Sequence, residues 1–179
     1  MLTPRRKHIR LSGYDYSAEG GYFVTVVTHG REPLFGEVVD GEVVLSEFGK
    51  IVENTWLDLV NHNGNIGLDE FVVMPNHIHG IIMIFEPVGA GSPAPTGDAV
   101  GADEPAPTRN VSLSEIVRQL KTFSARRINT LRGTPGTPVW QRNYYDHIIR
   151  SDREYEEIAA YIANNPSNWL TDTERLPEA

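Results

Sequence analysis

The sequence predicts an α+β domain in which helices pack on an antiparallel β-sheet. Runs rich in β-branched and aromatic residues, typical of strands, occupy residues 22–28, 71–85 and 146–150. Between and after them lie amphipathic stretches, two of which open with a Ser-x-x-Glu capping box. The predicted order is strand, hairpin, helix, strand, strand, helix, strand, helix. Without the hairpin and the last helix this is β-α-β-β-α-β, the ferredoxin-like or split βαβ arrangement.

Length and composition favour one domain that spans residues 1–179. The chain has no cysteine, which excludes disulfides, thiolate nucleophiles and zinc–thiolate sites. No apolar run approaches the roughly 18 residues of a membrane span, and no secretory signal follows Met1. We therefore expect a cytoplasmic protein with no membrane partner.

The first elements are predicted from local patterns. Residues 1–21 mix basic residues with Gly, Tyr and Ser, and we expect an irregular basic arm. A strand at 22–28 follows, and then a hairpin at 37–45, where Asp40-Gly41 supplies the positive φ that a primed turn requires. Ser46 caps a helix that is expected to run to about residue 62.

Residues 71–85 are two apolar runs joined at Pro75-Asn76, which predicts two strands with a tight connection. Because strand side chains alternate between faces, His77 and His79 point the same way. Two imidazoles side by side are suited to a divalent metal ion, although a His-x-His pair in a strand is also compatible with ordinary packing.

Residues 86–108 contain an imperfect repeat rich in Pro, Gly and Ala, and we expect a disordered loop insertion. Ser112 then caps a helix that reaches about Arg132. The net charge is −8, but residues 1–10 carry +4 and residues 109–150 carry +6. Local positive patches of this kind can bind nucleic-acid phosphates, or they can be solvated helix faces.

The last helix begins at Ser151 and must stop at Pro166. Tyr161 lies at the edge of its apolar stripe, and Asn165 lies one turn further on, about 40° around the axis. Because Asn165 precedes a proline, its backbone is expected to favour an extended conformation. The pattern fits either a tyrosine that faces a metal site or a half-buried tyrosine beside a helix stop.

Taken together, these stretches resemble the single-tyrosine HUH transposases, and among them the REP-associated tyrosine transposases. The matching segments occur in the order of that family and cover nearly the whole chain outside residues 86–108. They are Tyr-Phe-Val-Thr at 22–25 with Arg31 and Leu34-Phe35, Met-Pro-Asn-His-Ile-His at 74–79, Trp-Gln-Arg at 140–142 leading to 145–150, and Tyr-Ile-Ala-Asn-Asn-Pro at 161–166.

The resemblance implies an HUH nuclease fold whose C-terminal helix carries the catalytic Tyr161. Such enzymes cut single-stranded DNA through a 5′-phosphotyrosine intermediate and rejoin it to another strand during transposition. The metal would be Mg²⁺ or Mn²⁺ on His77, His79 and an amide, for which Asn165 has a better angle than Asn164. Two imidazoles suit Mn²⁺ somewhat better.

The expected partner is single-stranded DNA with hairpin structure, and relatives include homodimers. Two alternatives are a domesticated module that binds nucleic acid without cleaving it, and a hydrolase that uses a metal-bound water. Asp146 and His147 are candidates for a supporting role, and since they face opposite sides of a strand only one can reach the site. The expected phosphate contacts are Arg5, Arg6, Lys7, Arg10, Arg118, Lys121 and Arg132.

Overall fold

A four-stranded antiparallel sheet forms the centre of the computed structural model, which describes residues 13–86, 111–172 and 174–175. The strand order is β4-β5-β1-β6. The strands are β1 (Gly20–Val27), β4 (Ile66–Met74), β5 (His77–Ile84) and β6 (Tyr145–Ile149). With the helices between them they follow the ferredoxin-like path β-α-β-β-α-β, which confirms the predicted fold class.

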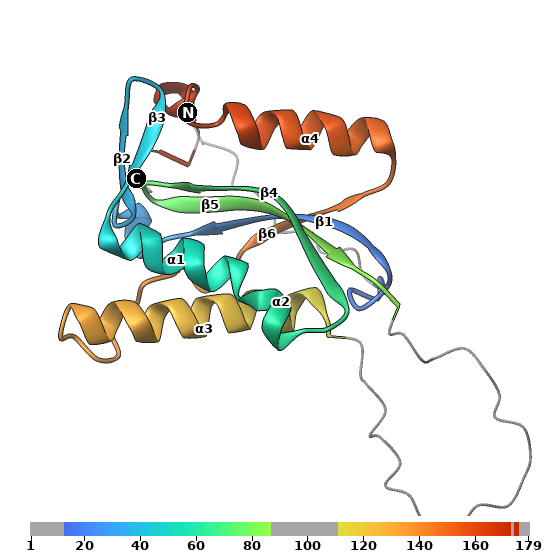
Figure 1. Ribbon diagram of the computed structural model, residues 1–179, viewed down its shortest axis with the longest axis horizontal. Helices are drawn as coiled ribbons and strands as arrows, with labels where there is room; N and C mark the ends of the chain where they lie inside the picture. The colour runs from blue at the N-terminus through green and yellow to red at the C-terminus, as the bar shows by residue number, and fades with distance from the viewer. Residues whose placement is uncertain (1–12, 87–110, 173, 176–179) are drawn as a thin grey trace, which may run out of the picture.

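The helices are distributed unequally over the two faces of the sheet (Figure 1). One face is covered by α1 (Glu47–Leu57), α2 (Leu59–His62) and α3 (Leu113–Leu131), and the other by α4 (Asp152–Asn164). The larger hydrophobic cluster lies on the α1 and α3 side, whereas a small cluster of Phe23, Ile81 and Ile162 lies under α4. On the face covered by α4, polar side chains therefore occupy one end of the sheet.

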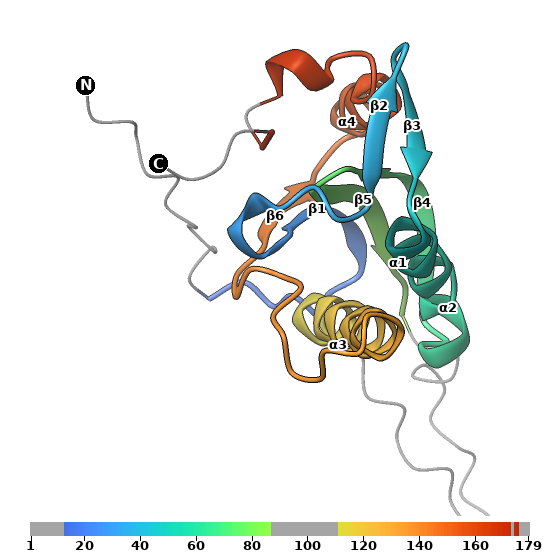
Figure 2. The same ribbon diagram turned by 90° about the vertical axis from the view of Figure 1, so that its left-hand side faces the viewer.

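The predicted hairpin is a separate two-stranded sheet of β2 (Gly36–Val39) and β3 (Glu42–Leu45). Asp40 and Gly41 both have positive φ, at 51° and 81°, as a type I′ turn requires. The hairpin stands beside the end of α4 (Figure 2), and its tip at Gly41 lies against Ser167. It thus encloses the end of the sheet at which β4 turns into β5.

Some predicted boundaries were wrong. The helix expected from Ser46 to about residue 62 does reach His62, but it is interrupted at Asp58 and resumes as the short helix α2. The first strand begins at Gly20, inside the predicted irregular arm. Strand β4 begins at Ile66 rather than near residue 71. The sequence does not reveal this earlier start because a register shift between Leu68 and Phe71 interrupts the alternation that would identify a strand.

Most of the predicted basic arm and nearly all of the Pro/Gly/Ala-rich loop lie outside the described residues. Within the described part of the chain, no helix is long and apolar enough to cross a membrane.

Gly80 in the centre of β5 provides a test of the packing between the sheet and α1. The indole of Trp56 stacks on Phe71, with ring centroids 5.6 Å apart, directly over Gly80. A Cβ at Gly80 would lie well inside van der Waals contact with that indole and 3.1 Å from the Phe71 Cβ. We expect Gly80→Ala to lower the free energy of unfolding by about 1–3 kcal/mol in urea denaturation.

Gly64→Ala is the matched control, because a Cβ there meets no atom within 4 Å. Its effect should stay within about 0.5 kcal/mol of wild type. Equal unfolding midpoints for the two variants would show that the Trp56 packing over β5 is wrong.

Candidate active site

The two histidines of β5 lie side by side on the face of the sheet covered by α4. His77 and His79 are both buried, and their Nε2 atoms are 3.1 Å apart. Strand alternation brings them to this face, while Ile78 between them enters the core on the other side. The predicted pairing of the imidazoles is present in the structure.

Each imidazole is oriented by a hydrogen bond to its Nδ1 atom. The Asn76 Nδ2 group donates to two carbonyls, of Glu174 at 2.7 Å and Arg31 at 3.2 Å, so its Oδ1 atom faces the His77 Nδ1 atom at 2.8 Å. Since that oxygen can only accept, Nδ1 carries the proton of the neutral His77 ring and Nε2 presents a lone pair. Thr25 Oγ1 lies 2.8 Å from the His79 Nδ1 atom and orients that ring in the same way.

Burial lowers the pKa of His77 to about 3, and the nearby positive charge of Arg31 acts in the same direction. The Asn165 side chain acts in the opposite direction on this pKa, without outweighing burial. His77 is therefore neutral near pH 7, which is the form of histidine that binds metals.

Tyr161 comes from α4 and reaches the histidines within the same chain. Its hydroxyl oxygen lies 3.3 Å from the His79 Nε2 atom, and its ring stands edge-on to Phe23. The residue is 47% exposed, so solvent reaches it while its hydroxyl oxygen lies at the site. This combination of contact and access is what a nucleophile needs.

Asn165 is buried near His77, whereas Asn164 is exposed and donates its side-chain amide to the Ala160 carbonyl. The extended backbone expected before Pro166 is not adopted. Asn165 has φ −59° and ψ −42°, because its N–H donates to the Ile162 carbonyl and tightens the last turn of α4. The Asn165 Oδ1 atom has no hydrogen-bond partner among the described residues.

Asp172 lies at this site, although it was not predicted from the sequence as a site residue. It follows the short helix η2 (Trp169–Thr171), and its side chain is 3% exposed. Its Oδ2 atom lies 3.5 Å from the His77 Nε2 atom and has no hydrogen-bond partner in the described part of the chain. Ligand atoms of His77, His79 and Asp172 lie within 4.8 Å of one another.

These atoms fit a divalent cation. Nitrogen ligands about 2.1 Å from one ion lie roughly 3.0–3.4 Å apart, depending on whether the ion is octahedral or tetrahedral. The two imidazoles have this spacing, and near them lie the buried Asn165 Oδ1 and Asp172 Oδ2 atoms, which have no hydrogen-bond partner within the described part of the chain. A mixed set of two nitrogens with amide and carboxylate oxygens suits Mn²⁺ better than Mg²⁺.

The two candidate supporting residues on β6 are directed elsewhere. The His147 Nε2 atom lies 2.6 Å from Glu154 Oε1 at the start of α4. The Arg150 N–H and, secondly, His147 lower the pKa of that glutamate. Asp146 lies on the opposite side of β6, the side that faces the larger core, as strand alternation predicts.

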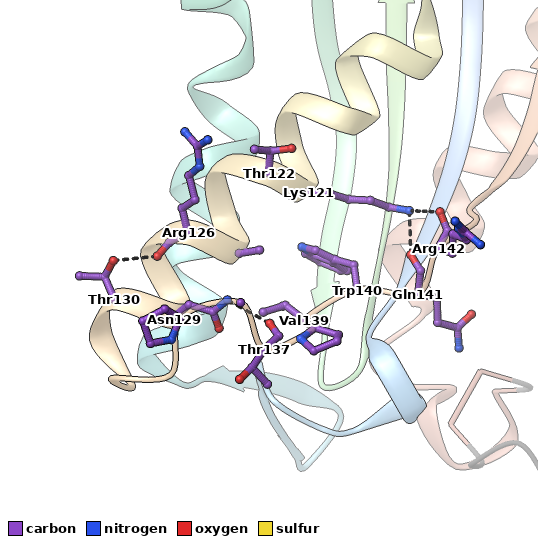
Figure 3. A pocket seen from close by; sticks show the side chains of 14 residues that line it. Lys121, Thr122, Arg126, Asn129, Thr130, Thr137, Val139, Trp140, Gln141 and Arg142 are labelled. Atoms are coloured by element: carbon purple, nitrogen blue, oxygen red, sulfur yellow. Dashed lines mark hydrogen bonds between the residues drawn. The ribbon is translucent and has the colours of Figure 1, made fainter.

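The predicted DNA contacts on α3 lie across the sheet from the histidines. Arg118 pairs with Glu115, Lys121 Nζ donates to the carbonyls of Gln141 and Asn143 at 3.0 Å, and Arg132 donates to Asn129 and Thr137. Lys121 lines a cavity of about 680 Å³ between α3 and residues 135–142 (Figure 3), which is separate from the histidine site. Arg5, Arg6, Lys7 and Arg10 lie outside the described residues.

The fold of this chain is similar to that of solved transposase structures. A solved structure of a REP-associated tyrosine transposase bound to a REP hairpin has a similar fold, with a TM-score of 0.54 and 20% identity. That similarity covers 94% of this chain and 74% of the other. A crystal structure of a candidate transposase from Deinococcus radiodurans R1 has a TM-score of 0.48 and 21% identity, and covers 92% and 97% of the two chains.

A protein of Haemophilus influenzae (strain ATCC 51907 / DSM 11121 / KW20 / Rd), described as an uncharacterized protein, is 37% identical over 170 residues. The matched region is 93% of this chain and 91% of that protein. This chain belongs to the same family as the Haemophilus protein. No family profile matches the sequence.

Proposed function

We propose that this protein is a metal-dependent transposase that cuts and rejoins single-stranded DNA through a covalent bond to Tyr161. The observation that carries the proposal is the position of the Tyr161 hydroxyl, 3.3 Å from the Nε2 atom of His79 in the same chain. A half-exposed tyrosine beside buried atoms that can bind a metal is the arrangement expected of a nucleophile next to a Lewis acid.

In the proposed reaction, the Tyr161 oxygen attacks a backbone phosphorus atom and the bond from phosphorus to the 3′ oxygen breaks. The phenolic proton leaves to solvent water, which the 47% exposure of Tyr161 allows, and the departing 3′ oxygen takes up a proton. One phosphate ester replaces another, so the 5′-phosphotyrosine can be attacked by a new 3′ hydroxyl without ATP.

His77, His79 and Asn165 would hold the divalent ion, with Asn76 and Thr25 fixing the two imidazoles. When bound, the ion would polarise the scissile phosphate and compensate negative charge as it develops on the tyrosine oxygen. The His79 Nε2 atom cannot bind a metal and accept the tyrosine proton at the same time. For this reason the proposed role of His79 is metal binding, and the proton goes to water.

The proposed substrate is a single strand that carries a hairpin, by analogy with the REP hairpin in the related structure. The positive charge of residues 109–150 supports contact with phosphates. Lys121 and Arg132 donate to carbonyls of the chain, whereas Arg118 forms an exposed pair with Glu115 that a phosphate could replace. We therefore propose Arg118 as a phosphate contact, together with Arg5, Arg6, Lys7 and Arg10. Their replacement by glutamine should weaken binding and reduce its salt dependence.

The test is to incubate the purified protein with fluorescent single-stranded DNA that carries a hairpin, in MnCl₂. The proposal predicts a band that survives SDS and contains both protein and DNA, and that is absent when EDTA is added. A fully paired duplex of the same sequence should give no such band. Tight binding of the hairpin without any cleavage, across a panel of hairpins and metals, would instead favour the non-cleaving module.

A further inference from the structure

We propose that Asp172, which follows the last helical turn of the described chain, is a fourth ligand of the metal site. The proposal rests on the proposed function for the role of the two histidines as metal ligands, but it does not require that the protein cleaves DNA. It assigns a carboxylate oxygen to the ion in addition to two imidazoles and the amide of Asn165.

The two carboxylate oxygens of Asp172 lie in unequal environments. Its Oδ1 atom accepts a hydrogen bond from the Glu174 N–H at 2.8 Å, which is an ordinary local turn. Its Oδ2 atom is buried, lies 3.5 Å from the His77 Nε2 atom, and has no hydrogen-bond partner among the described residues. Burying a carboxylate oxygen without a partner costs free energy of folding, so a specific interaction is expected to offset that cost.

With its one proton on Nδ1, the neutral His77 ring has no proton on Nε2 to donate to Asp172. Its Nδ1 proton is used by Asn76, whose own orientation is fixed by the two carbonyls to which it donates. The neutral ring therefore directs a lone pair toward the Asp172 Oδ2 atom. Two electron-rich atoms that face each other in a buried site repel, and a cation between them converts that repulsion into attraction.

The chain after α4 is held in this position by contacts with Arg31 and Asn76. Arg31 Nη1 lies 2.6 Å from Glu174 Oε2, and Asn76 Nδ2 donates to the Glu174 carbonyl at 2.7 Å. The indole of Trp169 lies 6.0 Å from the His77 ring, measured between centroids. These contacts link the segment of Asp172 to the residues that orient His77, so the carboxylate is held at the site and does not depend on DNA for its position.

The experiment measures Mn²⁺ binding by the DNA-free protein, by isothermal titration calorimetry and by loss of the electron paramagnetic resonance signal of free Mn²⁺. Wild type should bind one ion. Asp172→Asn, which keeps the Oδ1 acceptor, should bind at least about tenfold more weakly, and Asp172→Ala should lose more. Asp152→Asn, an exposed aspartate at the start of α4, is the matched control and should bind like wild type.

A second measurement separates ligation from a structural role. In EDTA, Asp172→Asn should unfold at the same temperature as wild type or higher, because it removes an uncompensated buried charge. With Mn²⁺ at about a hundred times its Kd, wild type should gain roughly 5–10 °C and the variant clearly less. A variant that is destabilised equally in EDTA and in Mn²⁺ would overturn the proposal.

The two proposals fail differently. If Asp172→Asn binds Mn²⁺ like wild type while His77→Ala does not bind it, the Asp172 assignment is wrong and the histidine site stands. If wild type binds no Mn²⁺ without DNA, the assignment of Asp172 as a preformed ligand is overturned. Metal-dependent cleavage would then still be tested by the covalent adduct.

Discussion

Replacing Tyr161 by phenylalanine is expected to abolish the covalent protein–DNA adduct, with a loss of at least about 10³-fold in the rate of its formation. The substitution removes the oxygen that lies 3.3 Å from the His79 Nε2 atom and leaves the ring against Phe23. The fold and Mn²⁺ binding should therefore stay close to wild type. The measurement is the time course of the SDS-resistant band in MnCl₂.

Tyr155→Phe is the matched control, because Tyr155 lies on the same helix and its hydroxyl donates to Asp69 at 2.9 Å. It should form the adduct at nearly the wild-type rate. If Tyr161→Phe still releases cut DNA while no adduct forms, the nucleophile is a water and the protein is a hydrolase. If Tyr161→Phe still forms the adduct, the assignment of Tyr161 is wrong.

The second large effect is expected at His79, which contacts both the other histidine and the tyrosine. His79→Ala removes one of the two proposed nitrogen ligands and the hydrogen bond between its ring and Thr25. We expect adduct formation to fall at least about 10²-fold at any Mn²⁺ concentration, together with Mn²⁺ affinity. Calorimetry and the adduct assay, run on the same preparation, measure the two losses.

His62→Ala is the control for the loss of an imidazole. His62 lies in α2, on the other side of the sheet, where it forms an exposed pair with Asp58 at 3.3 Å. Exposed pairs of this kind contribute little to stability, and the variant should retain adduct formation. Unchanged activity in His79→Ala would contradict the metal site.

Much of the site follows from the periodicity of strands and helices. Alternation along residues 77–79 predicts that both histidines face the same way, and the angle around the last helix selects Asn165 over Asn164. Those two inferences need only local geometry. The structure has both features, with the imidazoles 3.1 Å apart and Asn165 buried while Asn164 is exposed.

The parts of the site that could not be predicted depend on contacts between distant residues. Asp172 follows the end of α4 and belongs to no periodic pattern. Its segment is held through nearby Glu174, which pairs with Arg31, 143 residues away in the sequence. Thr25 meets His79 only through the pairing of β1 with β5. The backbone carbonyls to which Lys121 and Arg132 donate likewise come from a loop that packs beside α3, which a charge count along the sequence cannot show.

The most direct test of the account is the identification of the residue that becomes attached to DNA. The adduct formed in MnCl₂ is digested with nuclease and trypsin, and the modified peptide is fragmented in a mass spectrometer. Trypsin should release residues 154–175 as one peptide that contains both Tyr155 and Tyr161. The account predicts a 5′-phosphoryl nucleotide on Tyr161, and a nucleotide on Tyr155 or on any other residue would contradict it.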